Sequence, residues 1–168
     1  MHPYVALARQ TIEEYIRTGK TPAPPAPLPP NMKSKAGAFV SLKKQGELRG
    51  CIGTIEPVCE NLASEIIGNA VSASTRDPRF PPVSAGELDA LDISVDVLSP
   101  PEAVDGPESL DPKRFGLIVS AGHRRGLLLP DIAGVDTVEE QIAICRRKAG
   151  IMRDEEVTLQ RFTVERYR

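Results

Sequence analysis

Apolar residues recur along this chain with two different periods. Between residues 4 and 18 they return every three or four positions, which predicts an amphipathic helix that ends at Gly19. In residues 91–98 an apolar residue stands at every second position, which predicts a strand with one buried and one mostly wet face. Residues 21–30 contain six prolines and are predicted to form extended, polyproline-like chain.

Two hairpins are expected, each followed by a helix. The first spans residues 38–55 with its turn at residues 44–47, and the second turns at residues 121–126. Pro57 is predicted to open one helix, as a proline in the first helical position would. The capping-box pair Thr137 and Glu140 is predicted to open the other helix, which ends at Gly150.

Further elements complete the pattern. Ser84 and Glu87 form another capping box, and residues 99–112 are predicted to form a proline-rich acidic loop. Residues 157–167 are predicted to form one final strand. The predicted fold class is α+β, with a mixed or antiparallel sheet and flanking helices.

A short internal repeat links the two hairpins. The segment GELRG at residues 46–50 and the segment GHRRG at residues 122–126 share three identities at an offset of 76. Each copy lies in a predicted hairpin that leads through a proline towards a helix. The pattern favours an internal duplication of a hairpin-helix unit, and a cleft is often found at such a junction.

Four short motifs follow one another in a recognisable order. They are LRGCIG at residues 48–53, DPRF at 77–80, GLLLP at 126–130 and KAG at 148–150. The series resembles the AMME-region protein family, also called AmmeMemoRadiSam system protein A. The resemblance implies an α+β fold with a smaller subdomain that forms a cleft. It also implies two partners, a Memo-like protein and a radical S-adenosylmethionine enzyme, and it carries no settled activity.

The resemblance covers almost the whole chain and implies a single AMME-type domain over residues 1–168. Within it we expect an N-terminal helix (1–20), a proline-rich connector (21–35) and a body (36–168).

Composition narrows the class of protein. The net charge of −2 does not favour binding to nucleic acid or to an anionic membrane. The N-terminal residues do not resemble a signal peptide, and no apolar run is long enough to span a bilayer. Three cysteines in a chain of 168 residues are expected to stay reduced. These features predict a cytoplasmic protein.

Cys51 is the candidate nucleophile or acid/base group, because it lies between glycines in the most specific motif. A reactive thiol needs nearby positive charge or a base. His123, in the second copy of the internal repeat, could supply the base. Gly50 and Gly53 would allow a ligand or another segment of backbone to approach closely. The alternative is a small cysteine that only packs in a strand.

Basic side chains form a second theme. Arg49 and Arg125 are predicted to hold an anion, because a guanidinium fork suits carboxylate or phosphate. Arg79 is a further candidate for binding, although Asp77 could simply hold it in a turn that ends a helix. Lys148 is either a functional amine or a charge that stabilises the end of its helix. The alternative for the hairpin arginines is pairing with the acidic loop.

No metal site or cofactor is predicted, because the cysteines and histidines lack ligand spacing and no phosphate-binding loop occurs. Two functions remain open. One is an enzyme with a cysteine-centred cleft that acts on a small anionic or modified substrate, in a pathway with a Memo-like protein and a radical S-adenosylmethionine enzyme. The other is a non-catalytic adaptor or binding module for the two partners or for nucleic acid.

Overall fold

The chain begins with the helix that the apolar period predicts. This helix, α1 (Pro3–Thr18), buries Val5, Ala8 and Ile12 on one face. Gly19 ends it with a φ of 73°, a left-handed conformation that glycine adopts without strain. The computed structural model, which describes residues 1–168, continues into an irregular connector with one short 3₁₀ turn, η1 (Pro30–Met32).

The first predicted hairpin is confirmed. Strand β1 (Ala38–Lys44) pairs antiparallel with β2 (Glu47–Gly53). The two-residue turn between them has positive φ at both Gln45 (53°) and Gly46 (81°), as a type I′ turn requires.

The helix after this hairpin starts later than predicted. Helix α2 (Leu62–Thr75) has Asn61 as its N-cap, whose side chain accepts a hydrogen bond from the N–H of Ser64. The expected start at Pro57 is wrong, and Val58, directly after it, is exposed. The reason is Glu65, whose carboxylate accepts the N–H groups of Val58 and Cys59 and so holds this segment as a loop.

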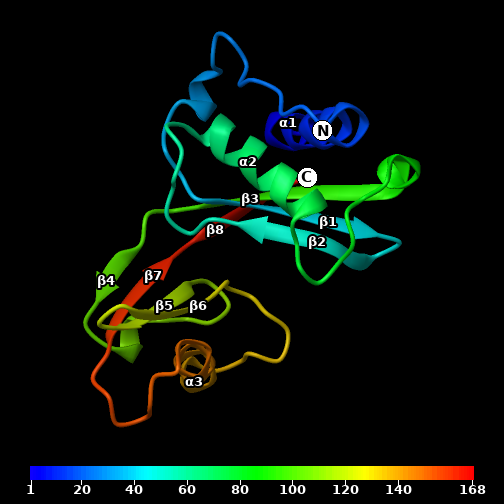
Figure 1. Ribbon diagram of the computed structural model, residues 1–168. Coiled ribbons are helices and arrows are strands. Elements are labelled where there is room, and N and C mark those ends of the chain that lie inside the picture. Colours follow the sequence, from blue (N-terminus) through cyan, green and yellow to red (C-terminus); the bar gives the residue numbers. More distant parts are fainter. The chain divides into compact units, whose positions relative to one another are not determined.

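The predicted strand at residues 91–98 is confirmed as β3 (Leu91–Leu98), which follows the 3₁₀ turn η2 (Ala85–Ala90) and its capping box. The first sheet has the order β2-β1-β3-β8, in which β8 is the last strand (Val164–Tyr167). Figure 1 shows α1 and α2 on one side of this sheet. The opposite side, called the outer face here, is free of helices from this unit.

Two sequence predictions need correction. The acidic loop contains a short strand, β4 (Glu102–Val104), and a 3₁₀ turn, η3 (Pro107–Ser109). The expected single final strand is two strands, β7 (Thr158–Phe162) and β8, which belong to different sheets. Thr163 separates them, and its N–H and C=O bond to Ser99 instead of to a sheet partner.

The second predicted hairpin is confirmed with a shorter turn. Strands β5 (Gly116–Ala121) and β6 (Arg124–Leu128) enclose only two turn residues, and Gly122 has a φ of 61°. Helix α3 (Val138–Ala149) follows with the predicted cap at both ends. It packs on β5 and β6, and the sheet has the order β4-β7-β5-β6.

The chain thus forms two units, residues 1–98 with 165–168 and residues 99–164, and its class is α+β with two antiparallel sheets. Both units repeat one connectivity. A hairpin supplies a central and an edge strand, a helix follows, and the next strand pairs antiparallel with the central one. The internal duplication, the cleft and the single-domain division that the sequence suggests stay predictions.

Candidate functional site

Cys51 lies on β2, at the open edge of the first sheet. Its backbone N–H donates to Oδ2 of Asp77 at 3.0 Å, and its C=O accepts from Nη2 of Arg79 at 3.2 Å. These two groups therefore point away from β1. In an antiparallel ladder, a residue with this orientation forms a non-hydrogen-bonded pair, whose side chains come closest together.

The partner of Cys51 in that pair is Ser41 on β1. The Ser41 hydroxyl lies 3.1 Å from the Cys51 sulfur, and either atom can donate. Both side chains are half-buried and project from the outer face, opposite the core residues Val40 and Leu42. The thiol is consequently neither sealed in the core nor fully exposed.

Asp77 and Arg79 connect the DPRF segment to the LRGCIG segment. The Asp77 carboxylate is buried and accepts from Nε and Nη2 of Arg79 at 3.0 and 2.8 Å. The hydrogen bond from Arg79 is the main reason that the pKa of Asp77 lies well below its usual range, and the N–H of Cys51 adds to the effect. The pKa of Arg79 is raised, chiefly by Asp77 and to a smaller extent by the negative charge of a Cys51 thiolate.

A groove of about 260 Å³ lies on the outer face beside Ser41. Its cationic lining residues are Lys43, Arg166 and Arg168, against the single carboxylate of Asp92, and the Ser41 and Ser94 hydroxyls line it as well. Charged and hydroxyl groups of this kind suit a small polar molecule that carries negative charge.

One of these cations has a fixed position. Arg166 donates from Nε and Nη2 to the two carboxylate oxygens of Asp96 at 2.7 and 2.8 Å. Asp96 is 2% exposed, although it occupies the strand face that the sequence predicts to be wet. The bidentate ion pair orients the guanidinium and neutralises the carboxylate.

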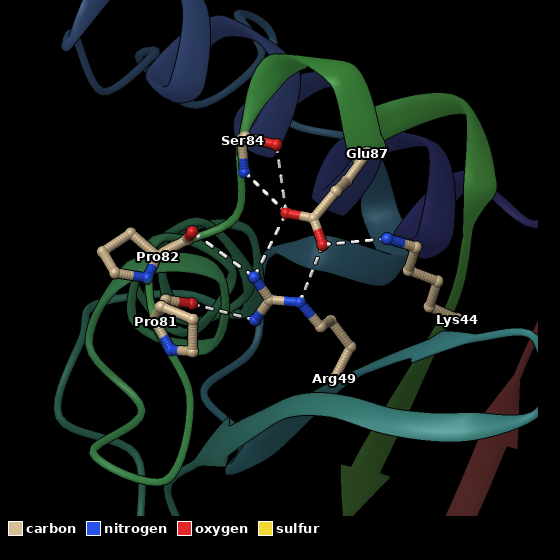
Figure 2. Close-up of polar contacts among 6 residues, drawn as sticks. All are labelled: Lys44, Arg49, Pro81, Pro82, Ser84 and Glu87. Atoms are coloured by element: carbon tan, nitrogen blue, oxygen red, sulfur yellow. Dashed lines mark hydrogen bonds and ion pairs between the residues drawn. The ribbon is translucent and has the colours of Figure 1, made fainter.

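Arg49 has a different environment from the predicted anion site (Figure 2). Its Nε and Nη2 donate to the Glu87 carboxylate at 3.0 and 3.1 Å, and its remaining contacts go to the carbonyls of Pro81 and Pro82. Lys44 also binds Glu87, at 3.2 Å. The hydrogen bond from Arg49 is the largest of several effects that lower the pKa of Glu87 to about 2.

This network fastens the loop before η2 to β2. Arg49 is the extra residue of a β-bulge, since Lys43 pairs with Leu48 and Leu42 pairs with Gly50. Its side chain keeps 14% of its surface exposed. Protein groups therefore surround the guanidinium that the sequence offered to a ligand.

The two motif glycines have packing reasons to be glycine. A Cβ on Gly50 would lie 2.2 Å from the Ala73 carbonyl oxygen of α2, so helix and strand touch there. A Cβ on Gly53 would overlap the ring of Phe39, which is its partner across the ladder. Close approach is confirmed at both positions, but the approaching group is the protein itself.

The remaining predicted residues belong to the second unit, whereas Cys51 belongs to the first. His123 is exposed in the two-residue turn, and Arg125 is exposed on β6. The Lys148 ammonium donates to the Leu127 carbonyl on the open edge of β6 at 2.8 Å. Lys148 therefore has a structural partner of its own.

The other two cysteines differ from Cys51. Burial raises the pKa of the Cys145 thiol to about 11. Burial, together with the nearby Glu65 carboxylate, also raises the pKa of Cys59. Neither thiol lies next to the groove as Cys51 does through Ser41, since no cysteine is itself a lining residue. No group of three or more His, Cys, Asp or Glu side chains in residues 1–168 is arranged to hold a metal ion.

The matching connectivity of the two units allows a comparison within the chain. Counted from the turn, the third pair of each hairpin contains a glycine that touches its helix, Gly50 in one and Gly126 in the other. The fourth pair is Ser41 with Cys51 in the first unit, but Ile118 with Leu127 in the second. The same backbone arrangement is thus compatible with an apolar pair, so the framework does not require a thiol and a hydroxyl.

Sequence reasoning missed Ser41, Lys43, Asp96 and Arg166. Their signal was present as polar residues at alternate positions of strands, which mark the face opposite the core. The pairing of strands distant in sequence, which brings them together, was not readable from that pattern.

Comparisons with known proteins agree with this architecture. The AMMECR1 family model matches residues 5–167. The chain belongs to the AMMECR1 family. A Thermotoga maritima protein is 57% identical, and the match covers 99% of this chain and 98% of that protein.

Two other AMMECR1-family relatives are informative. The crystal structure of an uncharacterised protein from Pyrococcus horikoshii has a TM-score of 0.87 and 39% identity, over 97% of this chain and 88% of that one. A Clostridium acetobutylicum protein is 49% identical over 99% of this chain, which spans only 36% of that longer protein. No helix of the present structure has the length and apolar character that a membrane crossing requires.

Proposed function

We propose that this AMMECR1-family protein is a group-transfer enzyme that acts on a small anionic molecule, with Cys51 as its nucleophile. The substrate would lie in the groove on the outer face of the first sheet. The observation that carries the proposal is the Ser41–Cys51 pair, which stands beside that groove where the second unit has an apolar pair.

The neighbours of Cys51 support a reactive thiol. The Ser41 hydroxyl can donate a hydrogen bond to the sulfur, and the Arg79 guanidinium donates to the Cys51 carbonyl at 3.2 Å, so a positive charge lies near this residue. Positive charge near a cysteine favours the ionised, nucleophilic form. Lys43 and Arg168 at the groove would bind the anionic part of the substrate.

The chemical step would be a substitution at an electrophilic carbon of the substrate. The Cys51 sulfur forms a bond to that carbon, and the bond to the leaving group breaks with its electron pair. The thiol proton passes to the leaving group, so the first half of the reaction is balanced without an added oxidant or reductant. An acceptor molecule would then take the group from sulfur and restore the thiol.

Site-resolved alkylation tests the proposal. The native protein is treated with iodoacetamide near neutral pH, and the modified peptides are quantified by mass spectrometry. We expect Cys51 to react at least about tenfold faster than Cys59 and Cys145, whose raised pKa values make them internal controls. Inorganic phosphate should slow Cys51 alone, and Arg79→Gln should reduce its rate.

Equal rates for Cys51 and Cys59 would exclude an activated thiol. If Cys51 reacts fast but phosphate does not slow it, the proposal that Cys51 is a nucleophile stands and the proposal of an anion site beside it is wrong. His123→Ala and Arg125→Ala extend the test to the second unit, because each should slow alkylation only if its side chain takes part.

We also propose a cytoplasmic location for the enzyme. The low redox potential of the cytoplasm would keep a reactive thiol reduced.

A second candidate function is an adaptor for a Memo-like protein and a radical S-adenosylmethionine enzyme. The observation that favours it is the longer Clostridium acetobutylicum relative, in which this region is joined to a large additional segment. Physical linkage to other sequence is typical of a module that works with a partner. Co-purification of the tagged protein with either partner at low salt tests this function, and a clean separation at low salt counts against it.

A further inference from the structure

The exposed side of α3 carries a groove of about 520 Å³ that lies wholly in the second unit. Its size falls within the range of roughly 300–1,000 Å³ that is typical of ligand sites. Ile142, Ala143 and Ile151 are its apolar lining residues, and its two exposed arginines, Arg147 and Arg153, are called the border arginines here. Both border arginines are far from Cys51 in the sequence. They belong to the second unit, whereas Cys51 belongs to the first.

The two border arginines differ from three other arginines of this unit, whose side chains bind protein groups. Arg124 pairs with Glu155, and Arg161 pairs with Glu102. Arg146 donates to the carbonyls of Met152 and Glu155. By contrast, the side chains of Arg147 and Arg153 are exposed and have no hydrogen bond or ion pair within the chain.

The charge around the groove is also one-sided. Three arginines line it, at positions 146, 147 and 153, against the single carboxylate of Glu139, which leaves a local net charge of 3 − 1 = +2. The whole chain has a net charge of −2, so this positive surface is a local feature. A complementary ligand would carry at least two carboxylates around an apolar group.

We propose that this groove binds an acidic peptide segment of a partner protein. An apolar side chain of the segment would lie on Ile142 and Ile151, and flanking carboxylates would pair with Arg147 and Arg153. Guanidinium groups bind carboxylates through paired, parallel hydrogen bonds, which gives such a site geometric specificity. The proposal is independent of the Cys51 site, because the two share no residue and belong to different units.

The experiment uses the full chain and three fluorescein-labelled short peptides. The first carries glutamates around a pair of leucines, the second has lysine for each glutamate, and the third has serine for each leucine. We expect the first peptide to bind by fluorescence anisotropy, at least about tenfold more tightly than either of the others. Salt should weaken the binding.

Charge reversal locates the site. The double variant R147E/R153E should lose at least about tenfold in affinity for the first peptide. The matched double variant K33E/K35E, which changes two exposed lysines of the first unit, should bind as the unaltered chain does. Should charge reversal disturb folding at the end of α3, R147Q/R153Q removes the two charges with less change to the helix.

Three outcomes would overturn the proposal. They are equal binding by R147E/R153E and K33E/K35E, equal binding of the glutamate and lysine peptides, and displacement of the peptide by a single-stranded oligonucleotide at lower concentration than by unlabelled peptide. Cys51→Ala should leave peptide binding unchanged. A failure of peptide binding therefore leaves the alkylation result intact, and the reverse also holds.

Discussion

The buried carboxylate of Asp77 binds the backbone N–H of Cys51 at 3.0 Å, across an interval of 26 residues. The turn after α2 thereby provides a hydrogen-bond acceptor for β2 at its open edge, at the residue proposed to react. Arg79 connects the same two residues, because it donates to both the Asp77 carboxylate and the Cys51 carbonyl. The DPRF motif thus supports the LRGCIG motif, and it fixes the backbone from which the thiol projects.

Asp77→Asn should lower the free energy of unfolding by about 2 kcal/mol at neutral pH, because a charged hydrogen-bond acceptor is lost. The pKa of Asp77 is lowered in the folded state, mainly by Arg79, so its contribution is present above the unfolded pKa and is lost as the pH falls. The difference from the unaltered chain should therefore shrink below about pH 4. Urea unfolding across this range measures it.

Hydrogen exchange supplies a local readout of the same change. The Cys51 amide should lose protection in Asp77→Asn and keep it in Asp89→Asn, which alters an exposed carboxylate without a partner. A pH-independent stability difference, or an unchanged Cys51 amide, would contradict the role assigned to Asp77.

Glu87→Gln should destabilise the first unit by about 2 to 3 kcal/mol at neutral pH, because Arg49 would keep its charge in a mostly buried position. The folded-state pKa of Glu87, about 2, is lower than the unfolded value, so this stabilisation is lost as the pH falls from about 4.3 towards 2. Chemical denaturation at several pH values checks both statements. The contrary result would come from Arg49→Gln. If Arg49 binds an external anion instead, this variant should abolish the protection of Cys51 by phosphate and lose little stability.

Gly126→Ala and Gly50→Ala should each lower the free energy of unfolding by about 3 kcal/mol. A Cβ at these positions would lie 1.8 Å from the Cys145 carbonyl oxygen and 2.2 Å from the Ala73 carbonyl oxygen, and neither backbone can move without its helix. Gly68→Ala is the matched control, since this helical glycine has nothing within 4 Å of the added Cβ.

The control should be more stable than the unaltered chain by roughly 0.5–1 kcal/mol, because alanine is the better helix former. Thermal unfolding ranks the three variants. A Gly126→Ala protein as stable as Gly68→Ala would show that α3 does not rest on β6 as described.

Ser41→Ile combined with Cys51→Leu gives the first unit the pair that the second unit already has. We expect the fold to survive, with a change of no more than about 2 kcal/mol in the free energy of unfolding, because the backbone accommodates this pair at Ile118 and Leu127. Circular dichroism and urea unfolding measure this, and the fast alkylation should disappear. A double variant that does not fold would show that the polar pair is part of the framework.

Much of the fold was readable from the sequence because its signals are local. The apolar period of residues 4–18, the capping boxes at Ser84 and Thr137 and the turn at Gly46 each act within a few neighbouring residues. The start of α2 was missed because Glu65 captures the N–H groups of Val58 and Cys59, and a buried carboxylate that bonds backward along the chain leaves no periodic pattern.

By itself, the sequence determined the helices, the two hairpins and the family. Only the tertiary structure decided that the chain makes two sheets and that its last stretch is divided between them. It also decided that Arg49 and Lys148 hold protein groups, and that Ser41 meets the thiol. The physical reason is that a side chain's hydrogen-bond partner depends on which distant strands pair, and pairing is a property of the whole core rather than of neighbouring residues.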